Sequence, residues 1–495
     1  MKRPLLMGSS SLIVSMLLAA CAVGPDYVAP HTSLEPLRHV PASDAAGAHH
    51  APSLDTWWTG FDDAMLVTII ERALAQNLDL QAAFARVQQA RAAAASAGAQ
   101  LWPSVDLDAS ASAQHQSLVS PNGSLARTFP GYSRDQREYT FGAAASWEID
   151  LAGGLRRDAA AAAHEAEAAQ AAQAGTRVTV AADAADAYLQ VRGYQARLAV
   201  AQDQIATDQR LLDLVRVRVK AGAADEREAA QADALLKQAR TVVPTLRVQL
   251  NAQLNRLDVL MGVQPGTYAA ELSAPAAIPG VPAIDASPDA GALLRRRPDV
   301  IAAERRLAAS NERIGAAIAD YYPKLSLTGL LGFDSAGSHE LFTARAFQPS
   351  ITAGLRWRLF DFGKVDAEVA AARGANAEAL AIYRQSVLRA AEDVENAFVA
   401  LVETQNRGKE LDAEVASLTR ARDLSQRAYK AGAITLTDVL DADRQLLVAR
   451  DDLDATRADA ARAAVGAYRA LGGGWSAAPN SLSERLPGLA QDGVR

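Results

Sequence analysis

The sequence predicts an elongated α+β fold built from two copies of one pattern of helices and paired strands. Two stretches, residues 155–221 and 364–431, lack proline, hold two glycines each and consist mainly of helix-compatible residues. At about 1.5 Å per residue, a helix of this length would extend roughly 100 Å. Two such rods cannot fold into a compact globule, so they must form a fibre, a bundle or the wall of a tube.

The other half of this prediction is two pairs of strands, expected at about 104–116 and 138–150 and again at about 324–334 and 349–360. Within each strand the side chains alternate between apolar and polar, which gives one apolar and one polar face. In the first strand, for example, Val105, Leu107 and Ala109 alternate with Asp106, Asp108 and Ser110. Strands of about ten residues with this alternation are typical of membrane barrels.

The same order of elements occurs twice along the chain. Residues 77–107 align without a gap on 297–327, and from Trp147 onward the matching residue lies 210 positions later. The matches include Pro103 with Pro323, Trp147 with Trp357, the run 220–223 with 430–433, and Gly262 with Gly472. The predicted organisation is a signal peptide (1–20), a tether (21–60), a first repeat (61–262), a linker (263–285), a second repeat (286–472) and a tail (473–495).

Shorter elements complete each repeat. Trp57, Trp58 and Phe61 offer an aromatic anchor, and Asp62 or Asp63 is expected to cap the helix that follows them. A return helix is expected from about 225 to 261, bent or broken at Pro244. The glycines of the Lys-Ala-Gly-Ala runs, Gly222 and Gly432, fit the left-handed position that ends a helix.

The N-terminus has the pattern of an export signal, with cationic residues at 2–3 and an apolar run at 12–20. The signal ends Leu18-Ala19-Ala20-Cys21, which resembles a bacterial lipobox. This resemblance implies that Cys21 becomes the first mature residue and carries covalent lipid. Ala22 in the next position implies sorting to the outer membrane. The alternative is a plain secretory signal cut near Ala20.

Composition and missing motifs exclude several classes of protein. The net charge of −7 argues against nucleic acid as a partner, and a single cysteine excludes an intrachain disulfide or a cysteine zinc site. Past the signal, no run of about 18 apolar residues predicts a transmembrane helix. The sequence contains no nucleotide-binding loop, serine-hydrolase elbow or zinc-protease motif. We therefore expect no enzyme activity, no metal and no cofactor apart from the lipid on Cys21.

Four strands per chain cannot close a barrel, and open sheet edges do not occur in lipid. At least two chains must combine, which gives eight strands, or three chains, which give twelve. Three are favoured because an eight-stranded barrel is filled by its own side chains and leaves no pore.

Several motifs, in their order and in their repetition, resemble the outer-membrane factors of tripartite efflux pumps, in particular the NodT-like lipoprotein branch of the TolC/OprM-like proteins. They are the lipobox followed by Val23–Tyr27, Trp57-Trp58, Asn77–Leu80, Trp147–Leu151, Arg297–Val300 and Leu359–Gly363. The resemblance implies a homotrimer with a 12-stranded β-barrel in the outer membrane and a 12-helix α-barrel reaching into the periplasm. It also implies a periplasmic adaptor and an inner-membrane pump of the resistance-nodulation-division type as partners.

The resemblance further suggests two functional sites. The turns at Gly222, Ala223, Gly432 and Ala433 should form the periplasmic tip that receives the adaptor. The run Leu440-Asp441-Ala442-Asp443-Arg444 is similar to the family segment that closes the resting channel, which places the gate at Asp441 and Arg444. The first repeat has Gln231 and Ala234 at these positions, so one such ring should form. The alternative interpretation of Asp441 and Arg444 is an ordinary exposed ion pair.

The resulting hypothesis is an exit duct that carries small toxic compounds or drugs across the outer membrane. Two alternatives stay open at this point. One is the exit duct of a type I protein secretion system, which uses the same architecture. The other is a structural coiled-coil lipoprotein of the cell envelope without a pore, against which the alternating strand pairs argue.

Overall fold

The computed structural model describes residues 22–30, 35–39, 52–284 and 296–476. Cys21, the predicted signal peptide and most of the predicted tail lie outside the described residues. The chain divides into two compact units, each made of several separate segments. The sheet unit contains residues up to 30, 88–168 and 303–382, and the helical unit contains 31–87, 169–302 and 383 onward.

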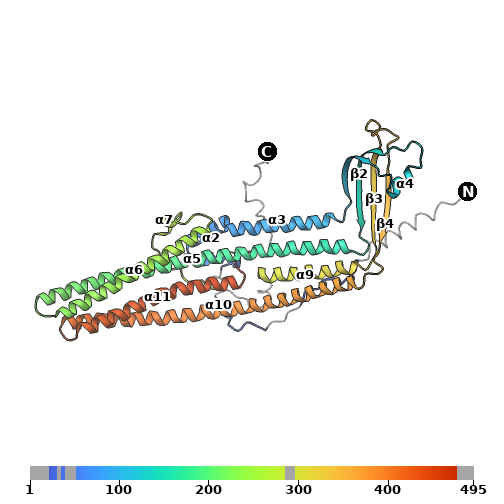
Figure 1. The fold of residues 1–495 in the computed structure, drawn as a ribbon. Coiled ribbons are helices and arrows are strands. Elements are labelled where there is room, and N and C mark those ends of the chain that lie inside the picture. The colour runs from blue at the N-terminus through green and yellow to red at the C-terminus, as the bar shows by residue number, and fades with distance from the viewer. Residues whose placement is uncertain (1–21, 31–34, 40–51, 285–295, 477–495) are drawn as a thin grey trace. The chain divides into compact units, whose positions relative to one another are not determined.

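The helices and strands follow the order shown in Figure 1. They are η2 (Leu54–Phe61), α2 (Ala64–Gln76), α3 (Leu78–Ala99), β1 (Ser104–His115), α4 (Pro121–Ala126), β2 (Asp135–Ile149), α5 (Gly154–Lys220), α6 (Glu226–Leu260), α7 (Ala269–Leu272), α9 (Pro298–Ala319), β3 (Lys324–Ser335), β4 (Ser350–Arg356), α10 (Lys364–Lys430) and α11 (Leu436–Ala470).

The sheet unit is built on one antiparallel sheet with the strand order β1-β2-β3-β4, so β1 and β4 are its edges. The register pairs Leu107 with Ala143, Ala143 with Leu331, and Gly329 with Ile351. Residues of like character therefore meet across neighbouring strands. The region between β1 and β2 contains the short helix α4, which begins where the hydroxyl of Ser120 accepts a hydrogen bond from the Gly123 amide.

Strand β4 is shorter than the sequence predicts, since it ends at Arg356 and not near residue 360. The next side chain, Trp357, donates its indole N–H to the carbonyl oxygen of Tyr321 at 3.0 Å. The carboxylate of Asp361 accepts hydrogen bonds from the amides of Gly363 and Val365. These residues therefore already belong to the turn that begins α10, and apolar alternation alone could not reveal this.

The core of the helical unit forms around the predicted aromatic anchor. Trp57, Trp58 and Phe61 are buried, and the ring of Trp57 stacks on Tyr468 of α11 with centroids 5.2 Å apart. The carboxylate of Asp63 caps α2 by accepting from the amides of Met65 and Leu66. Small side chains allow the close approach of helices, and α5 contributes a run of them to this core, namely Ala181, Ala182, Ala184, Ala185 and Ala187.

Helix α6 runs from Glu226 to Leu260 without interruption, so of the two predicted outcomes at Pro244, a bend or a break, the break is wrong. Proline removes one backbone donor and crowds the preceding turn. Its neighbours offset this cost, because Val243 and Leu246 are buried against Ala201 of α5. Packing against α5 thus holds the helix together across the proline.

Candidate functional site

The sheet separates its side chains into two faces. On the apolar face the register brings Leu107, Ala143 and Leu331 into one row and Leu325 beside Leu355. Several of these side chains are exposed to an unusual degree, for example Ile351 at 83% and Leu107 at 69%. A water-soluble sheet seldom leaves such a face uncovered. This face is therefore suited to contact with lipid.

The opposite face of the sheet is polar. The hydroxyls of Ser104 and Ser146 lie 2.9 Å apart, and those of Ser110 and Thr140 lie 2.8 Å apart. Gly142 and Gly332 face one another across β2 and β3, where a Cβ on either would come within 3 Å of the Cα of the other. A sheet with one apolar and one hydroxyl-lined face can separate a hydrocarbon phase from a water-filled lumen.

A buried ion pair fixes the first described residues to the sheet unit. The guanidinium of Arg157 on α5 donates to the carboxylates of Glu312 on α9 at 2.8 Å and of Asp26 at 2.9 Å. It also donates to the backbone carbonyl of Val23 at 3.3 Å. Arg157 and Glu312 are both buried. This contact holds the chain only two residues beyond Cys21.

The same segment depends on two glycines. Gly24 has a φ of +99°, and a Cβ built on it would lie 2.4 Å from the Cα of Gly315. A Cβ on Gly315 would in turn lie 2.9 Å from the carbonyl oxygen of Val23. Backbone meets backbone here, so neither position tolerates a side chain. The N-terminal segment is therefore held against α9 by shape as well as by charge.

The two predicted tip turns have the same backbone geometry. Gly222 and Gly432 have φ values of +69° and +77°. In the first turn the amide of Ala223 donates to the carbonyl of Arg218 at 2.8 Å, and in the second the amide of Ala433 donates to the carbonyl of Ala428 at 2.9 Å. This is the Schellman pattern of a helix C-terminus. The left-handed glycines that the sequence predicts are confirmed.

The predicted gate residues lie on the exposed first turns of α11. The guanidinium of Arg444 is paired with the carboxylate of Asp441 on the same helix, at 2.7 Å, and Gln445 donates to the other Asp441 oxygen at 2.8 Å. An exposed pair of this spacing contributes a few tenths of a kcal/mol and is easily exchanged for another partner. The closure between neighbouring helices, expected from the sequence, stays a prediction.

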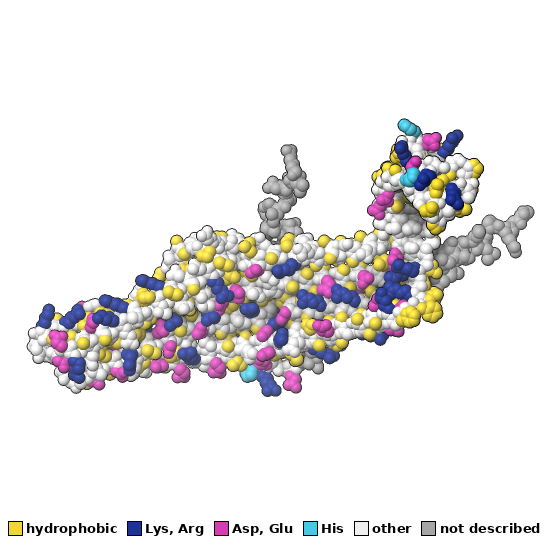
Figure 2. All heavy atoms as spheres, in the orientation of Figure 1, with side chains coloured by type: hydrophobic (Ala, Val, Ile, Leu, Met, Phe, Trp, Pro, Cys, Tyr) yellow, Lys and Arg dark blue, Asp and Glu magenta, His cyan; other side chains and the backbone are white. Residues whose placement is uncertain are grey.

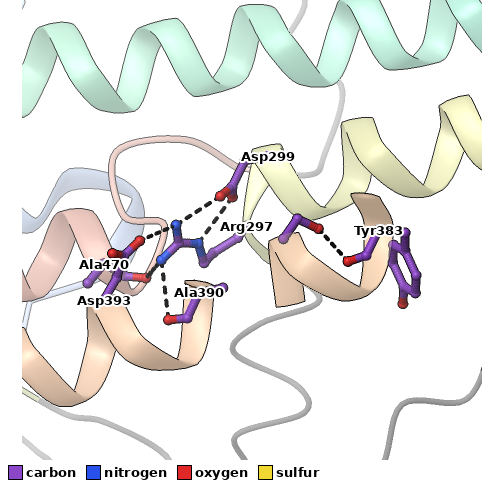
Figure 3. Close-up of polar contacts among 7 residues, drawn as sticks. Arg297, Asp299, Tyr383, Ala390, Asp393 and Ala470 are labelled. Atoms are coloured by element: carbon purple, nitrogen blue, oxygen red, sulfur yellow. Dashed lines mark hydrogen bonds and ion pairs between the residues drawn. The ribbon is translucent and has the colours of Figure 1, made fainter. Parts of the chain in front are cut away.

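Arg297, next to the start of α9, joins three helices of the helical unit (Figure 3). Its guanidinium donates to the carboxylates of Asp299 at 2.9 Å and of Asp393 on α10 at 2.8 Å. It also donates to the carbonyls of Ala390 at 3.4 Å and of Ala470, the last residue of α11, at 3.1 Å. Arg297, Ala390 and Ala470 are buried, so the two carbonyls depend on this side chain, whereas the carboxylates of Asp299 and Asp393 are also open to water.

The matching residue of the first repeat, Asn77, has the same role on a smaller scale. Its side-chain amide donates to the carbonyl of Leu260, the last residue of α6, at 2.9 Å. Its side-chain oxygen accepts from the Leu80 amide at 3.1 Å and so caps α3. The sequence motifs that contain Asn77 and Arg297 therefore fasten each short helix to the end of its return helix.

Sequence reasoning did not single out Arg157, Glu312, Asp208 or Asp443, although all four are buried charged residues. Each stands in a helix that carries exposed charged residues, and the sequence does not distinguish the buried charges from the exposed ones. Asp186 of α5 is paired with Arg462 of α11 at 2.7 Å. Charged side chains of both signs are spread along the helices on the face shown in Figure 2.

Within the described ranges, no helix is both long enough and apolar enough to cross a lipid bilayer. Nor does that part of the chain hold a group of three or more histidine, cysteine or acidic side chains arranged to bind a metal ion.

Comparison with known proteins identifies the class. The family model described as outer membrane efflux protein matches residues 69–263 and 290–473. A pyoverdine export outer membrane protein, OpmQ of Pseudomonas putida, is 33% identical over 427 residues, which are 85% of this chain and 88% of that protein. Nodulation protein T of Rhizobium leguminosarum bv. trifolii is 28% identical over 89% of this chain and 91% of its own length.

A solved structure of the outer-membrane channel OprN superimposes with a TM-score of 0.81 at 32% identity, and covers 92% of this chain and all of that one. The fold and the family model together define an outer-membrane channel. The chain belongs to the outer membrane efflux protein family. It serves as an efflux exit duct in the outer membrane and is not an enzyme, and the relatives do not favour the type I secretion alternative.

Proposed function

We propose that three copies of the chain close a 12-stranded β-barrel in the outer membrane, four strands from each, continuous with a 12-helix α-barrel in the periplasm. The observation that supports this most is the two-faced sheet with unpaired edges at β1 and β4. In lipid, every backbone N–H and C=O group must find a partner, so both edges must pair with other strands. Pairing β4 of one copy with β1 of the next satisfies both.

The two faces give a direct test with a matched control on one strand. Ile351 stands on the apolar face of β4 and the next residue, Thr352, on the polar face. A cationic side chain on the lipid face costs about 2–4 kcal/mol at the bilayer midplane. We expect Ile351→Arg to reduce the yield of membrane-inserted trimer, measured by native mass spectrometry, and Thr352→Arg to leave it unchanged. Equal yields from the two variants would contradict the assignment of faces.

We also propose that Cys21 carries lipid and that the protein is an outer-membrane lipoprotein. The lipobox pattern that ends at Cys21 supports this, and the contact of Arg157 with the carbonyl of Val23 holds the chain that follows it to the sheet unit. Two or more acyl chains give stable anchoring, whereas one is marginal. Mass spectrometry of the mature N-terminus tests the proposal, and an unmodified Cys21 would refute it. Cys21→Ser need not release the protein, since the barrel also holds it.

The tip turns are proposed to receive a periplasmic adaptor that links the duct to an inner-membrane pump of the resistance-nodulation-division type. Cys21 is the only cysteine, so an introduced cysteine gives a unique cross-linking site. We expect Ala223→Cys and Ala433→Cys to cross-link to the adaptor in cells. Ala252→Cys, exposed on the far part of α6, is the control and should not react. Cross-linking at residue 252 alone would place the adaptor elsewhere.

The cargo is proposed to be small toxic compounds or drugs, with selection made by the pump. The name of the OpmQ relative records export of pyoverdine by that protein, which supports a small-molecule cargo. Deleting the gene should increase accumulation of such a compound in cells, and supplying the parent chain should restore its export. No change in accumulation for any compound of this class would contradict the proposal.

A further inference from the structure

Two carboxylates are buried in the helical unit, and one oxygen of each lacks a hydrogen-bond partner in the part of the chain that the structure describes. Asp208 on α5 and Asp443 on α11 are each only 1% exposed. The Oδ2 atom of each has no hydrogen-bond partner among the described residues. An ionised carboxylate in this position loses its hydration and gains little in exchange. Neither residue is part of the gate or of the tip turns described above.

The surrounding groups offer incomplete compensation. On Asp208, the side-chain amide of Gln204 donates to Oδ1 at 2.8 Å. On Asp443, the cation that comes near is Arg422 of α10, whose Nη1 lies 3.9 Å from Oδ1, beyond hydrogen-bond range. Also from α10, the side chain of Gln426 hydrogen-bonds the Asp443 carboxylate, whereas the negative charge of Asp423 opposes its ionisation.

Several charged groups of α6 and α11 have partners elsewhere. Arg240 of α6 donates to Gln209, Asp233 binds Lys237, and Asp441 binds Arg444. The packing around the tip ends of these helices is otherwise apolar, with Leu212, Leu236 and Val439 in one cluster. The two carboxylates therefore stand at an apolar junction of α5, α10 and α11.

Burial raises the pKa of Asp208 to about 6, and the negative charge of Asp443 adds to the rise. Burial also raises the pKa of Asp443, against the opposing effect of Arg422. Both carboxylates thus bind a proton more readily here than in water.

We propose that Asp208 and Asp443 form a proton-dependent latch between α5 and α11, beside the gate residues Asp441 and Arg444. When protonated, the two side chains pack at the apolar junction and hold the helices together. When ionised, they favour an arrangement in which water reaches them and the helices separate. The effect on the channel rests on the proposed function, whereas the effect on helix packing does not.

The direction of the pH effect follows from the packed state binding protons more tightly than the separated state. The latch is fully formed below the usual aspartate pKa of 3.8 and is lost as the pH rises through about 6. Acidification of the periplasm therefore tightens α5 against α11, and neutral pH loosens them. Between about pH 8 and about pH 5, a single shift of this size changes the equilibrium about tenfold.

The matching positions of the other repeat provide internal controls. The residue that matches Asp208 is Leu418, so leucine is accepted at that position of the long helix. The residue that matches Asp443 is Asp233, which is partly exposed and paired with Lys237 at 2.5 Å. The latch thus exists at one of the two equivalent junctions. Asp233→Asn is a control, because it changes the aspartate that matches Asp443 in the first repeat and leaves the latch itself intact.

Hydrogen–deuterium exchange of the full-length protein in detergent tests the latch, read from peptides covering residues 205–215 and 439–449 and corrected for the intrinsic pH dependence of exchange. We expect the parent and Asp233→Asn to exchange about tenfold more slowly at about pH 5 than at about pH 8. Asp208→Asn and Asp208→Leu should lose this pH dependence and remain protected at both values.

A parent protein without pH-dependent protection, or an Asp208→Asn variant that responds as the parent does, would overturn the proposal. The same variants are then recorded in planar bilayers, where the latch predicts lower resting conductance at about pH 5 in the parent and no such change in Asp208→Asn. If protection depends on pH and conductance does not, the result supports the latch and counts against a gate at Asp441. Failure of the latch and failure of the proposed gate are therefore distinguishable.

Discussion

The two repeats of the chain share their backbone contacts and differ in their side-chain chemistry. In both, a tryptophan donates its indole N–H to a carbonyl at 3.0 Å, from Trp147 to Leu101 and from Trp357 to Tyr321. In both, the residue before the short helix binds the last carbonyl of the return helix.

The differences are concentrated at a few positions. Arg297 gathers two carboxylates and two carbonyls where Asn77 binds one carbonyl and caps one helix. Asp441 of the second repeat is matched by Gln231 in the first. Buried Asp208 is matched by Leu418. Duplication therefore explains the scaffold. The charges at Asp441 and Asp208, proposed to close and to regulate the pore, each occur in one repeat only, without a charged residue at the matching position of the other.

The largest expected difference between the repeats is in the contacts at Arg297 and Asn77. Arg297→Ala removes charge-assisted bonds and leaves buried carbonyls unpaired, which should cost about 2–3 kcal/mol. Asn77→Ala removes one hydrogen bond and one cap and should cost about 1–2 kcal/mol. Thermal unfolding in detergent, followed by circular dichroism, should give the larger loss for Arg297→Ala. Arg297→Lys should recover little of the lost stability, because lysine lacks the planar guanidinium group that donates several hydrogen bonds at once. Equal losses for the two alanine variants would show that the repeats are energetically alike here.

The tip turns should respond equally to substitution. Gly222 and Gly432 both have positive φ, and a Cβ on either meets no atom within 4 Å. The cost of alanine is therefore the left-handed backbone alone, about 1–2 kcal/mol at each turn. Local hydrogen exchange at residues 216–226 and 426–436 should increase to the same degree in Gly222→Ala and Gly432→Ala. A variant whose exchange stays at the parental level would show that its turn adopts another conformation.

The smallest effect is expected at the two indoles. Trp147→Phe and Trp357→Phe each remove one N–H donor and keep most of the ring, which should cost about 0.5–1.5 kcal/mol. Trp357 is 54% exposed and Trp147 is partly buried, so water can replace the lost bond more easily at Trp357. The melting temperature should therefore fall further for Trp147→Phe, and the reverse order would argue against hydration as the cause.

Much of this scaffold could be predicted from sequence because it depends on local signals. The absence of proline from residues 155–221 predicts a long helix, and the structure has α5 from Gly154 to Lys220. Alternation predicts each strand, and the Lys-Ala-Gly-Ala runs predict turns with a left-handed glycine. These signals are carried by the residues that form each element.

The rest depends on partners that are far away in sequence. Arg157 and Glu312 are 155 residues apart, and nothing near either residue indicates the other. Pro244 should disrupt a helix by itself, yet the burial of Val243 and Leu246 keeps α6 intact. The end of β4 is set by the contact of Trp357 with Tyr321 and not by its own apolar pattern. Burial and long-range pairing decide these features, and composition does not reveal them.

The central claim is that three chains surround one pore whose resting closure comes from the second repeat. Single-channel recording in planar bilayers tests it directly, with Asp441→Ala and Arg444→Ala compared with Gln231→Ala at the matching position of the first repeat. We expect trimers that conduct, a raised resting conductance in the Asp441 and Arg444 variants, and parental conductance in Gln231→Ala. Parental conductance and cation selectivity in both second-repeat variants, or an equal rise in Gln231→Ala, would contradict the account.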